Sequence, residues 1–242
     1  MAGVLRHARR ILFITGAGLS ADSGVPTYRG IGGLYDDAPT DEGIPIEEAL
    51  SGAMFRKDPT ISWRHMRRIQ NAFRDAHPNR GHEVIAELES RSEVWVLTQN
   101  VDGFHRRAGS TRVVDIHGDL STLFCPACDW TAHVDDMKDS DPVPRCPSCG
   151  AVVRPDIVLF GETLDPKKIL LMETAEAGGF DIVFSIGTSS LFSYVVEPVL
   201  RAVGAGHPTV EINPGLTDLS PIVRYRIPMR AAEALHAIAS RL

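Results

Sequence analysis

Short apolar runs that end in glycine or small polar residues recur along this chain. The first, Arg10–Thr15, is rich in strand-forming residues and ends at Gly16. Four more runs follow the same pattern, at residues 94–97, 113–116, 182–186 and 209–212. Runs of this length and composition are typical of strands that are buried on both faces of a parallel sheet.

Segments of helical periodicity lie between these runs, at about residues 80–90, 165–176, 196–205 and 229–242. This alternation predicts an α/β fold with a doubly wound parallel sheet of the Rossmann type. In such a sheet, ligands bind outside the carboxyl ends of the strands. The sequence places Gly, Asn, Gln, His, Thr and Ser at those ends, so we expect them to converge on one crevice.

Two regions interrupt the alternation and indicate a second, smaller domain. Residues 31–78 are loop-rich and then helical, and residues 124–153 contain all four cysteines. We expect these two insertions to form the small domain, and residues 1–30, 79–123 and 154–242 to form the large one. With 242 residues, 43% of them hydrophobic, the chain can bury a core of that extent.

Composition restricts the partners and the compartment. No stretch approaches the roughly 20 apolar residues of a membrane span, and no signal-peptide block precedes the first strand. We therefore expect a cytoplasmic protein without a membrane partner. The net charge of −6 disfavours direct nucleic-acid binding and suits basic, lysine-bearing protein substrates. The sequence leaves the oligomeric state open, and a monomer is compatible with it.

The four cysteines form two Cys-x2-Cys pairs, Cys125 with Cys128 and Cys146 with Cys149, and seventeen residues separate the pairs. This is the spacing of a zinc ribbon, in which four thiolates complete the tetrahedral shell of one Zn²⁺. A shell filled by sulfur leaves no position for water or substrate, so the metal is expected to be structural. Disulfide bonds are the alternative, and an intracellular setting disfavours them.

A glycine-rich turn follows the first strand. Residues 16–21 read Gly-Ala-Gly-Leu-Ser-Ala, a Gly-x-Gly-x-x-Gly/Ala pattern whose glycines let the backbone approach a pyrophosphate. A tight turn without a ligand is the alternative. A dehydrogenase would have a second strand and an acidic residue about 20 residues further on, but residues 30–37 have a loop pattern. The expected dinucleotide therefore serves a reaction other than hydride transfer.

Together these motifs resemble those of the sirtuins, in the family's order and over essentially the whole chain. The matching segments are GAGLSADSGVPTYRG at 16–30, TQNVD at 98–102, IHG at 116–118, the two cysteine pairs, RPDIVLFGE at 154–162, GTS at 187–189 and INP at 212–214. The resemblance implies an NAD-dependent protein lysine deacylase that binds NAD and an acylated-lysine protein between its two domains. Nicotinamide then leaves the ribose, and the acyl group passes to ADP-ribose.

The resemblance also assigns catalytic roles. His117 would be the general base that activates a ribose hydroxyl, and a histidine whose pKa lies near the working pH can do this. A packed or solvated side chain is the alternative for one histidine among nine. Asn100 and Asp102 would hold the nicotinamide amide, which needs one donor and one acceptor opposite it. Gln99 would contact the ribose near His117.

Further NAD contacts are implied in the first loop and at two later strand ends. From the first loop they are Gly16, Ala17, Gly18, Ser20, Asp22, Tyr28 and Arg29. The family more often has Phe at the position of Tyr28. From the later strand ends they are Gly187, Thr188, Ser189 and Asn213. Thr188 and Ser189 could also cap the helix that follows, which is compatible with phosphate binding there.

Residues 158–162 are expected to form an exposed extended strand that pairs with the substrate backbone. Such pairing supplies main-chain hydrogen bonds with little sequence selectivity. Val158, Gly161 and Glu162 belong to this segment, and Phe160 would line the tunnel for the acyl-lysine.

The acyl preference follows from one departure within the family. Sirtuins that prefer succinyl-lysine carry Tyr and, three residues later, Arg beside the acyl pocket. Ungapped counting back from Pro-Asn at 78–79 puts Met66 and Ile69 there, an apolar floor that would reject succinyl or malonyl groups and accept neutral ones. Both residues could instead be core positions of an amphipathic helix. Three neighbours could supply a cation if the alignment slips: His65, Arg67 and Arg68.

Two other functions remain open on the same fold. The pocket could transfer ADP-ribose to a protein or hydrolyse NAD, or the chain could be a non-catalytic NAD-sensing module. The presence of both His117 and Asn100 argues against the non-catalytic module.

Overall fold

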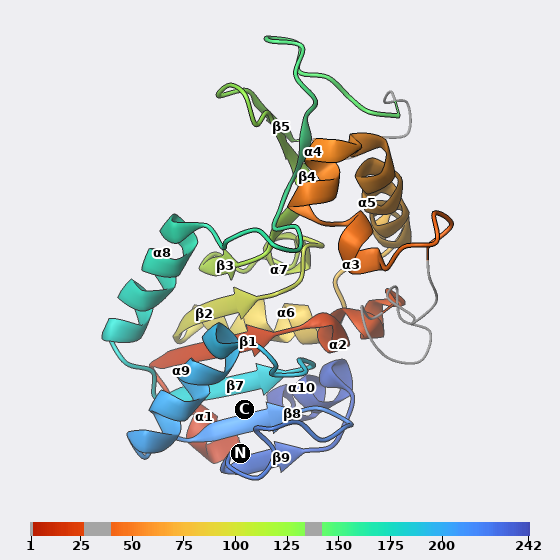
Figure 1. Cartoon of the computed structure of the whole chain (residues 1–242). Helices are drawn as coiled ribbons and strands as arrows, with labels where there is room; N and C mark the ends of the chain where they lie inside the picture. The colour runs from red at the N-terminus through yellow and green to blue at the C-terminus, as the bar shows by residue number, and fades with distance from the viewer. Residues whose placement is uncertain (1, 27–39, 134–141) are drawn as a thin grey trace.

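The computed structural model describes residues 2–26, 40–133 and 142–242. Tyr28 and Arg29 lie outside these described residues. Figure 1 shows a large α/β domain and a small domain that lies above its sheet, beyond the β3 edge. The chain passes between the two domains several times, because the small domain is built from segments inserted into the large one.

The large domain is centred on a six-stranded parallel sheet in the order β3-β2-β1-β7-β8-β9. Its strands are β1 (Arg10–Thr15), β2 (Glu93–Thr98), β3 (Val113–Asp115), β7 (Ile182–Ile186), β8 (Thr209–Ile212) and β9 (Tyr225–Ile227). The strand order reverses between β1 and β7, where a doubly wound sheet opens its ligand crevice. The predicted fold class and its five predicted strands are confirmed. The edge strand β9 was not predicted, because its three residues are only half-buried and have Arg226 at their centre.

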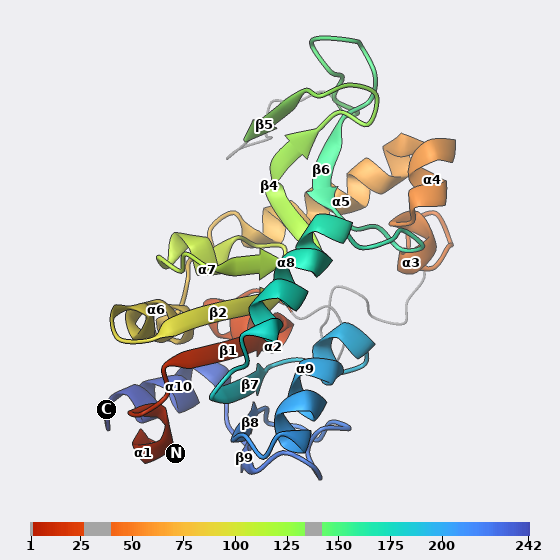
Figure 2. The same cartoon turned by 90° about the vertical axis from the view of Figure 1, so that its left-hand side faces the viewer.

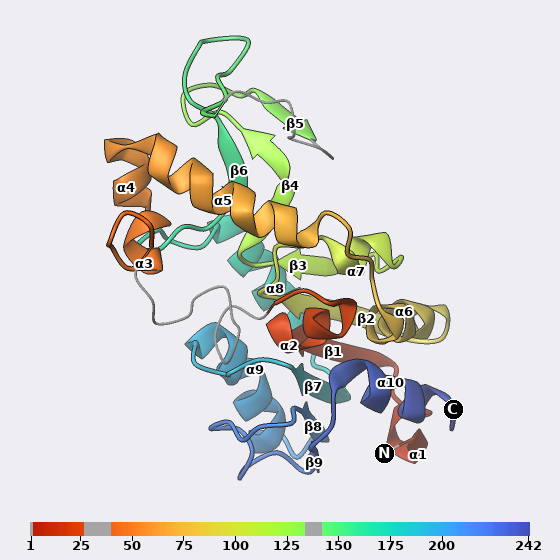
Figure 3. The same cartoon turned by 90° about the vertical axis from the view of Figure 1, so that its right-hand side faces the viewer.

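Helices cover both faces of this sheet. α8 (Pro166–Ala177) and α9 (Ser193–Gly204) pack on one face (Figure 2). α6 (Arg80–Glu87) and α10 (Ala231–Ala239) pack on the other, with the short α1 (Ala2–Leu5) (Figure 3). The periodicity predicts four of these helices, α6, α8, α9 and α10, and their observed ends differ from the predicted ones by at most three residues. Within the described residues, no helix is both long and apolar enough to cross a bilayer.

Short elements line the carboxyl ends of the strands. After β1 the chain enters α2 (Ala17–Ser20) and a 3-10 turn at Ala21–Ser23. After β2 it enters α7 (Phe104–Arg107). A second 3-10 turn, Leu88–Ser90, follows α6 and ends the helical segment predicted there.

The small domain contains a three-stranded antiparallel sheet and three helices. The strands are β4 (Gly118–Phe124), β5 (Thr131–His133) and β6 (Arg154–Ile157), and the helices are α3 (Ile46–Ala49), α4 (Gly52–Lys57) and α5 (Pro59–Phe73). Both sets of elements bury the same core around Trp63, which is fully buried. β6 and all of β4 except Phe124 lie outside the second insertion expected from the sequence. They belong to the small domain because their antiparallel pairing continues the ladder that carries the cysteine pairs.

Candidate active site

A cleft of about 1110 Å³ lies between the two domains, at the carboxyl ends of β1, β2, β7 and β8. Its large-domain wall consists of the glycine turn and the polar strand ends, and its small-domain wall includes Leu50, Ile69 and Leu120. The volume exceeds the roughly 300–1,000 Å³ of a site for a drug-sized ligand. The cleft can therefore hold a dinucleotide together with part of a second substrate.

Two glycine turns pack backbone against backbone at the cleft. Gly16 N–H donates to the Ile186 carbonyl at 3.0 Å, and Gly18 N–H donates to the Gly187 carbonyl at 2.8 Å. A Cβ atom at Gly18 would lie 2.6 Å from the Cα of Gly187, closer than side chains approach. The glycines are therefore required for this packing, which leaves main-chain groups of both loops facing the cleft, as a pyrophosphate site requires.

Strand-end side chains form a hydrogen-bonded row beside these turns. Gln99 Nε2 donates to Thr188 Oγ1 at 2.7 Å, and Asn213 Nδ2 donates to the Thr188 carbonyl at 3.0 Å. Thr188 Oγ1 also accepts from Ser190 N–H at 3.1 Å. Neither Thr188 nor Ser189 caps the next helix, because the N-cap of α9 is Phe192.

His117 lies in this cleft, directly after β3 and before β4. Its Nδ1 is 3.0 Å from the Gln99 carbonyl oxygen, which can only accept, so Nδ1 carries the proton. Nε2 then has an unshared electron pair, and it accepts from the Tyr194 hydroxyl at 2.6 Å. Burial lowers the pKa of His117. The ring is thus held neutral, in the tautomer that a general base needs.

Asn100 lies at the buried end of the cleft with half of its amide committed. Its Nδ2 donates to the Gly16 carbonyl at 3.0 Å and to Ser20 Oγ at 2.9 Å. Its Oδ1 is buried and has no hydrogen-bond partner among the described residues. Since a buried acceptor without a donor is costly, this oxygen is suited to receive an N–H from a ligand such as a carboxamide.

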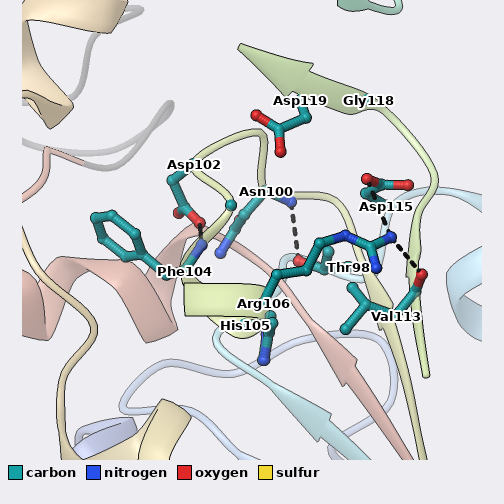
Figure 4. A pocket seen from close by; sticks show the side chains of 11 residues that line it. Thr98, Asn100, Asp102, Phe104, His105, Arg106, Val113, Asp115, Gly118 and Asp119 are labelled. Atoms are coloured by element: carbon teal, nitrogen blue, oxygen red, sulfur yellow. Dashed lines mark hydrogen bonds and ion pairs between the residues drawn. The ribbon is translucent and has the colours of Figure 1, made fainter. Parts of the chain in front are cut away.

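Asp102 does not line the main cleft. Its Oδ2 accepts from Ser20 Oγ at 2.6 Å, and its Oδ1 accepts from Phe104 N–H at 2.9 Å. It lines a much smaller adjoining cavity, which Asp119 also lines (Figure 4). Burial raises the pKa of Asp102. In this arrangement Asp102 holds Ser20, which in turn holds Asn100.

Asp22 lines the cleft but has both carboxylate oxygens engaged. Oδ2 accepts from Ala232 N–H at 2.8 Å in the first turn of α10, and Oδ1 pairs with Arg230 at 2.5 Å. The contact joins the glycine turn to the last helix of the fold. Asp22 therefore positions the first loop, and its expected direct contact with NAD would require one of these bonds to be exchanged.

Residues 158–162 do not form the extended strand that the sequence predicts. Phe160 N–H donates to the Leu50 carbonyl at 3.0 Å, and its carbonyl accepts from Gly52 N–H at 3.1 Å. Glu162 Oε2 accepts from Leu159 N–H at 3.0 Å, and Gly161 has a φ of +78°. The Phe160 bonds tie the segment to the helical part of the small domain, and the chain turns at Gly161, while all five residues of the segment line the cleft.

Of the two expected acyl-pocket residues, only Ile69 lines the cleft. Met66 is 1% exposed and packs in the small-domain core, as the alternative interpretation had it. The neighbouring cations have other partners. His65 and Arg64 bond Glu42, Arg68 pairs with Asp41, and the Arg67 guanidinium lies 5.5 Å from the centre of the Trp63 ring.

The four cysteine sulfurs converge at one end of the small domain. All four Sγ atoms lie within 4.8 Å of one another, with Cys125 and Cys149 3.5 Å apart and Cys128 and Cys146 3.6 Å apart. Sulfurs about 2.3 Å from a tetrahedral zinc lie ~3.8 Å apart, so the four fit the structural Zn²⁺. No disulfide joins them, since a bonded pair would be about 2.05 Å apart.

Tyr194 and Phe192 also belong to the site, although the sequence did not indicate them. Their rings stack with centroids 5.4 Å apart, and both contact the His117 ring edge-on. The available signal was their position five and three residues after the Gly-Thr-Ser strand end, where an α/β sheet places its ligand contacts.

The chain matches the family model of the Sir2 family over residues 16–195. It is 48% identical to the "NAD-dependent protein deacylase 2" of Pseudomonas aeruginosa, covering 100% of this chain and 96% of that protein. It is 35% identical to an "NAD-dependent protein deacetylase" of Bacillus cereus, covering 98% of this chain and 95% of that one.

Solved structures match along the same length. One is a "Sir2 homolog-NAD complex" at 32% identity, with a TM-score of 0.88 over 99% of this chain and 91% of that one. Another is a "Sir2-p53 peptide-NAD+" complex at 28% identity, with a TM-score of 0.83 over 98% and 95%. With its Rossmann-type sheet, its glycine turn and its four-cysteine cluster, the chain belongs to the Sir2 family of sirtuins.

Proposed function

We propose that this chain is an NAD-dependent protein lysine deacylase in which His117 is the general base. The observation that carries the proposal is the position of His117 in the dinucleotide cleft, with Nδ1–H fixed on the Gln99 carbonyl and Nε2 directed at a donor. Relatives over the full chain are named as deacylases and deacetylases, and solved relatives are named as complexes with NAD and with a p53 peptide.

The residues present fit NAD. The two glycine turns offer main-chain groups to the pyrophosphate, and the unpartnered Oδ1 of Asn100 suits the donor side of the nicotinamide amide. NAD supplies an ADP-ribosyl group that loses nicotinamide and accepts the acyl group. Gln99 and Asn213 would orient the riboses from the row that they form with Thr188.

His117 would take the proton of a ribose hydroxyl at Nε2. Burial keeps the imidazole neutral near pH 7, because the lowered pKa disfavours its charged form. When Nε2 gains a proton, the Nδ1–H bond to the Gln99 carbonyl stabilises the resulting imidazolium and keeps the ring in place. The same proton can later return to the leaving group, as general acid–base catalysis requires.

We also propose that the acyl site prefers neutral groups to succinyl or malonyl groups. The small-domain wall is apolar around Leu50, Ile69 and Leu159. Arg230 is the lone arginine or lysine of the cleft lining in the part of the chain that is described, and it is paired with Asp22. A buried carboxylate without a partner costs several kcal/mol, so acidic acyl groups would bind poorly.

The protein substrate would enter along residues 158–162. Because the main chain of Phe160 is already bonded to residues 50 and 52, the substrate would use the remaining main-chain groups of this segment. We retain the domain division proposed from the sequence, with the small domain extended to include β4 and β6.

Mass spectrometry of the products tests the proposal. Incubation with NAD and an acetyl-lysine peptide should yield free lysine peptide, nicotinamide and O-acetyl-ADP-ribose in equal amounts. An ADP-ribosylated peptide would indicate ADP-ribosyl transfer, and free ADP-ribose with intact acetyl-lysine would indicate NAD hydrolysis. NAD binding with no product of any kind would indicate a non-catalytic module.

A further inference from the structure

The Tyr194 hydroxyl occupies the one atom of His117 that the reaction needs. Nδ1 of His117 is committed to the Gln99 carbonyl, so Nε2 carries the only electron pair available to accept a proton. That pair already accepts from Tyr194 at 2.6 Å. An imidazole nitrogen has one such pair, so the Tyr194 hydroxyl and a ribose hydroxyl exclude one another there.

Tyr194 is a dependable donor. Burial raises its pKa to about 12, so the hydroxyl keeps its proton throughout the range in which proteins are stable. Its ring is fixed from two sides, by the stacked Phe192 and by the edge of His117. The packing of the two rings therefore holds the Tyr194 hydroxyl at Nε2 of His117.

The turn that carries this aromatic pair has a strained start. Ser190 has a φ of +56°, the one positive φ of a non-glycine residue among the described residues. Its Oγ is buried and has no partner within the described part of the chain. A left-handed φ at a residue other than glycine costs conformational energy, which is released if the turn adopts another conformation. Leu191 and Phe192, next in the chain, are 58% and 45% exposed and line the cleft.

We propose that Tyr194 is an internal competitor for the catalytic base, whose hydroxyl caps Nε2 of His117 until a ribose hydroxyl of the bound dinucleotide displaces it. The exchange replaces one hydrogen bond by another and moves no covalent bond. It keeps the base occupied while the cleft is empty, and it reduces the affinity for the dinucleotide by the free energy of the bond that must break. The inference rests on the proposed role of His117.

The competition is testable by isothermal titration calorimetry with ADP-ribose on the full chain. Tyr194→Phe removes the hydroxyl and keeps the ring. It should strengthen ADP-ribose binding by about two- to tenfold, the equivalent of one net hydrogen bond. Tyr225→Phe is the matched control, because Tyr225 lies in the edge strand β9 and makes no contact with His117. It should leave the affinity unchanged.

His117→Ala supplies the second arm. Without Nε2 there is nothing to cap, so Tyr194→Phe should have no effect on ADP-ribose affinity in the His117→Ala background. Unchanged or weaker binding by the single Tyr194→Phe variant would overturn the inference, and so would an equal gain in both backgrounds. Failure of the wild type to bind ADP-ribose would overturn the proposed function as well, whereas binding without the Tyr194 effect overturns the competition alone.

Discussion

The backbone of Gly118 runs so close to Asp156 that a Cβ atom at position 118 would lie 1.8 Å from the Asp156 carbonyl oxygen. Gly118 also has a φ of +94°, in the region that favours glycine. The contact joins β4 to β6 immediately after His117, and the His117 carbonyl accepts from Val158 N–H at 2.9 Å. The base is thereby fixed to the segment that is expected to hold the substrate.

Gly118→Ala should therefore separate β4 from β6. We expect a loss of about 3 kcal/mol or more in the free energy of unfolding, together with loss of deacylation, measured by urea denaturation and peptide assay. Gly204→Ala is the control, since a Cβ there meets nothing within 4 Å and Gly204 ends helix α9. Equal stability of the two variants would show that the Gly118 contact is not required.

His117→Ala should reduce deacylation at least about a hundredfold, as loss of a general base usually does. NAD binding should persist, because the glycine turns and Asn100 are untouched. His207→Ala, at an exposed turn after α9, is the matched control and should keep full activity. Retention of more than a tenth of wild-type turnover by His117→Ala would assign the base to another group.

Zinc removal should act through the fold. Cys125 and Cys146 belong to the small-domain core, so Cys146→Ser should lose the metal and loosen the cleft wall that this domain provides. Metal analysis should give one zinc per wild-type chain. Upon chelation, deacylase activity, followed by a peptide assay, and small-domain structure, followed by circular dichroism, should decline in parallel. Activity that stops before any structural change would point to a catalytic metal.

Acid should destabilise the protein through two buried histidines. Burial lowers the pKa of His82 from 6.5 to about 4 and that of His105 well below 6.5, and their rings lie 4.9 Å apart. As the pH falls below 6.5, the unfolded chain binds these protons first. The stability present above pH 6.5 is therefore lost towards pH 4, by up to about 1.4 kcal/mol per pH unit for each histidine.

His82→Gln isolates one of the two histidines. His82 Nδ1 accepts from Asn79 N–H in the capping box of α6, and Gln can keep that bond without titrating. Urea denaturation from pH 8 to pH 5 should show a shallower pH dependence for the variant. An identical slope would mean that His82 is not buried in its neutral form.

The acyl preference should appear in kcat/KM for acetyl-, myristoyl- and succinyl-lysine forms of one peptide. We expect the succinyl form to be at least about a hundredfold poorer, because a carboxylate would be buried without a cation. Ile69→Arg should raise the ratio of succinyl to acetyl activity by supplying that cation. A wild-type preference for succinyl-lysine would show that one of the α5 cations reaches the pocket.

Short-range sequence patterns predicted the features that depend on residues close together in the chain. The strands of the large sheet were predictable because they are buried on both faces, and the zinc cluster because its ligand spacing is short. Met66 and Ile69 lie on one helix, but only Ile69 reaches the cleft, because the rotation of α5 depends on how Trp63 packs against β6 and its neighbours. The hydrophobic pattern of α5 shows which residues are buried, but it does not show which of them face the cleft.

Long-range contacts defeated prediction elsewhere. The hydrogen bond from Tyr194 to His117 spans 77 positions of the chain, and a left-handed turn at Ser190 precedes Tyr194. The bonds from Phe160 to residues 50 and 52 join the predicted substrate segment to the first insertion of the small domain, more than 100 positions earlier in the chain. Asp102 belongs to one of the family's sequence motifs, yet its hydrogen bonds to Ser20 and Phe104 hold its carboxylate at the smaller cavity.

The position of β1 has a consequence for synthesis on the ribosome. β1 is made before both of its neighbours in the sheet, yet it lies at the centre of the sheet, where Ile11 pairs with Val94 on one side and with Ile182 on the other. The second edge of β1 must wait until the chain has been extended past β7, while the cysteine pairs emerge earlier. The zinc-bearing small domain can thus assemble while an apolar strand edge of the large domain still awaits its neighbour, a period in which the nascent chain is exposed to aggregation and to chaperones.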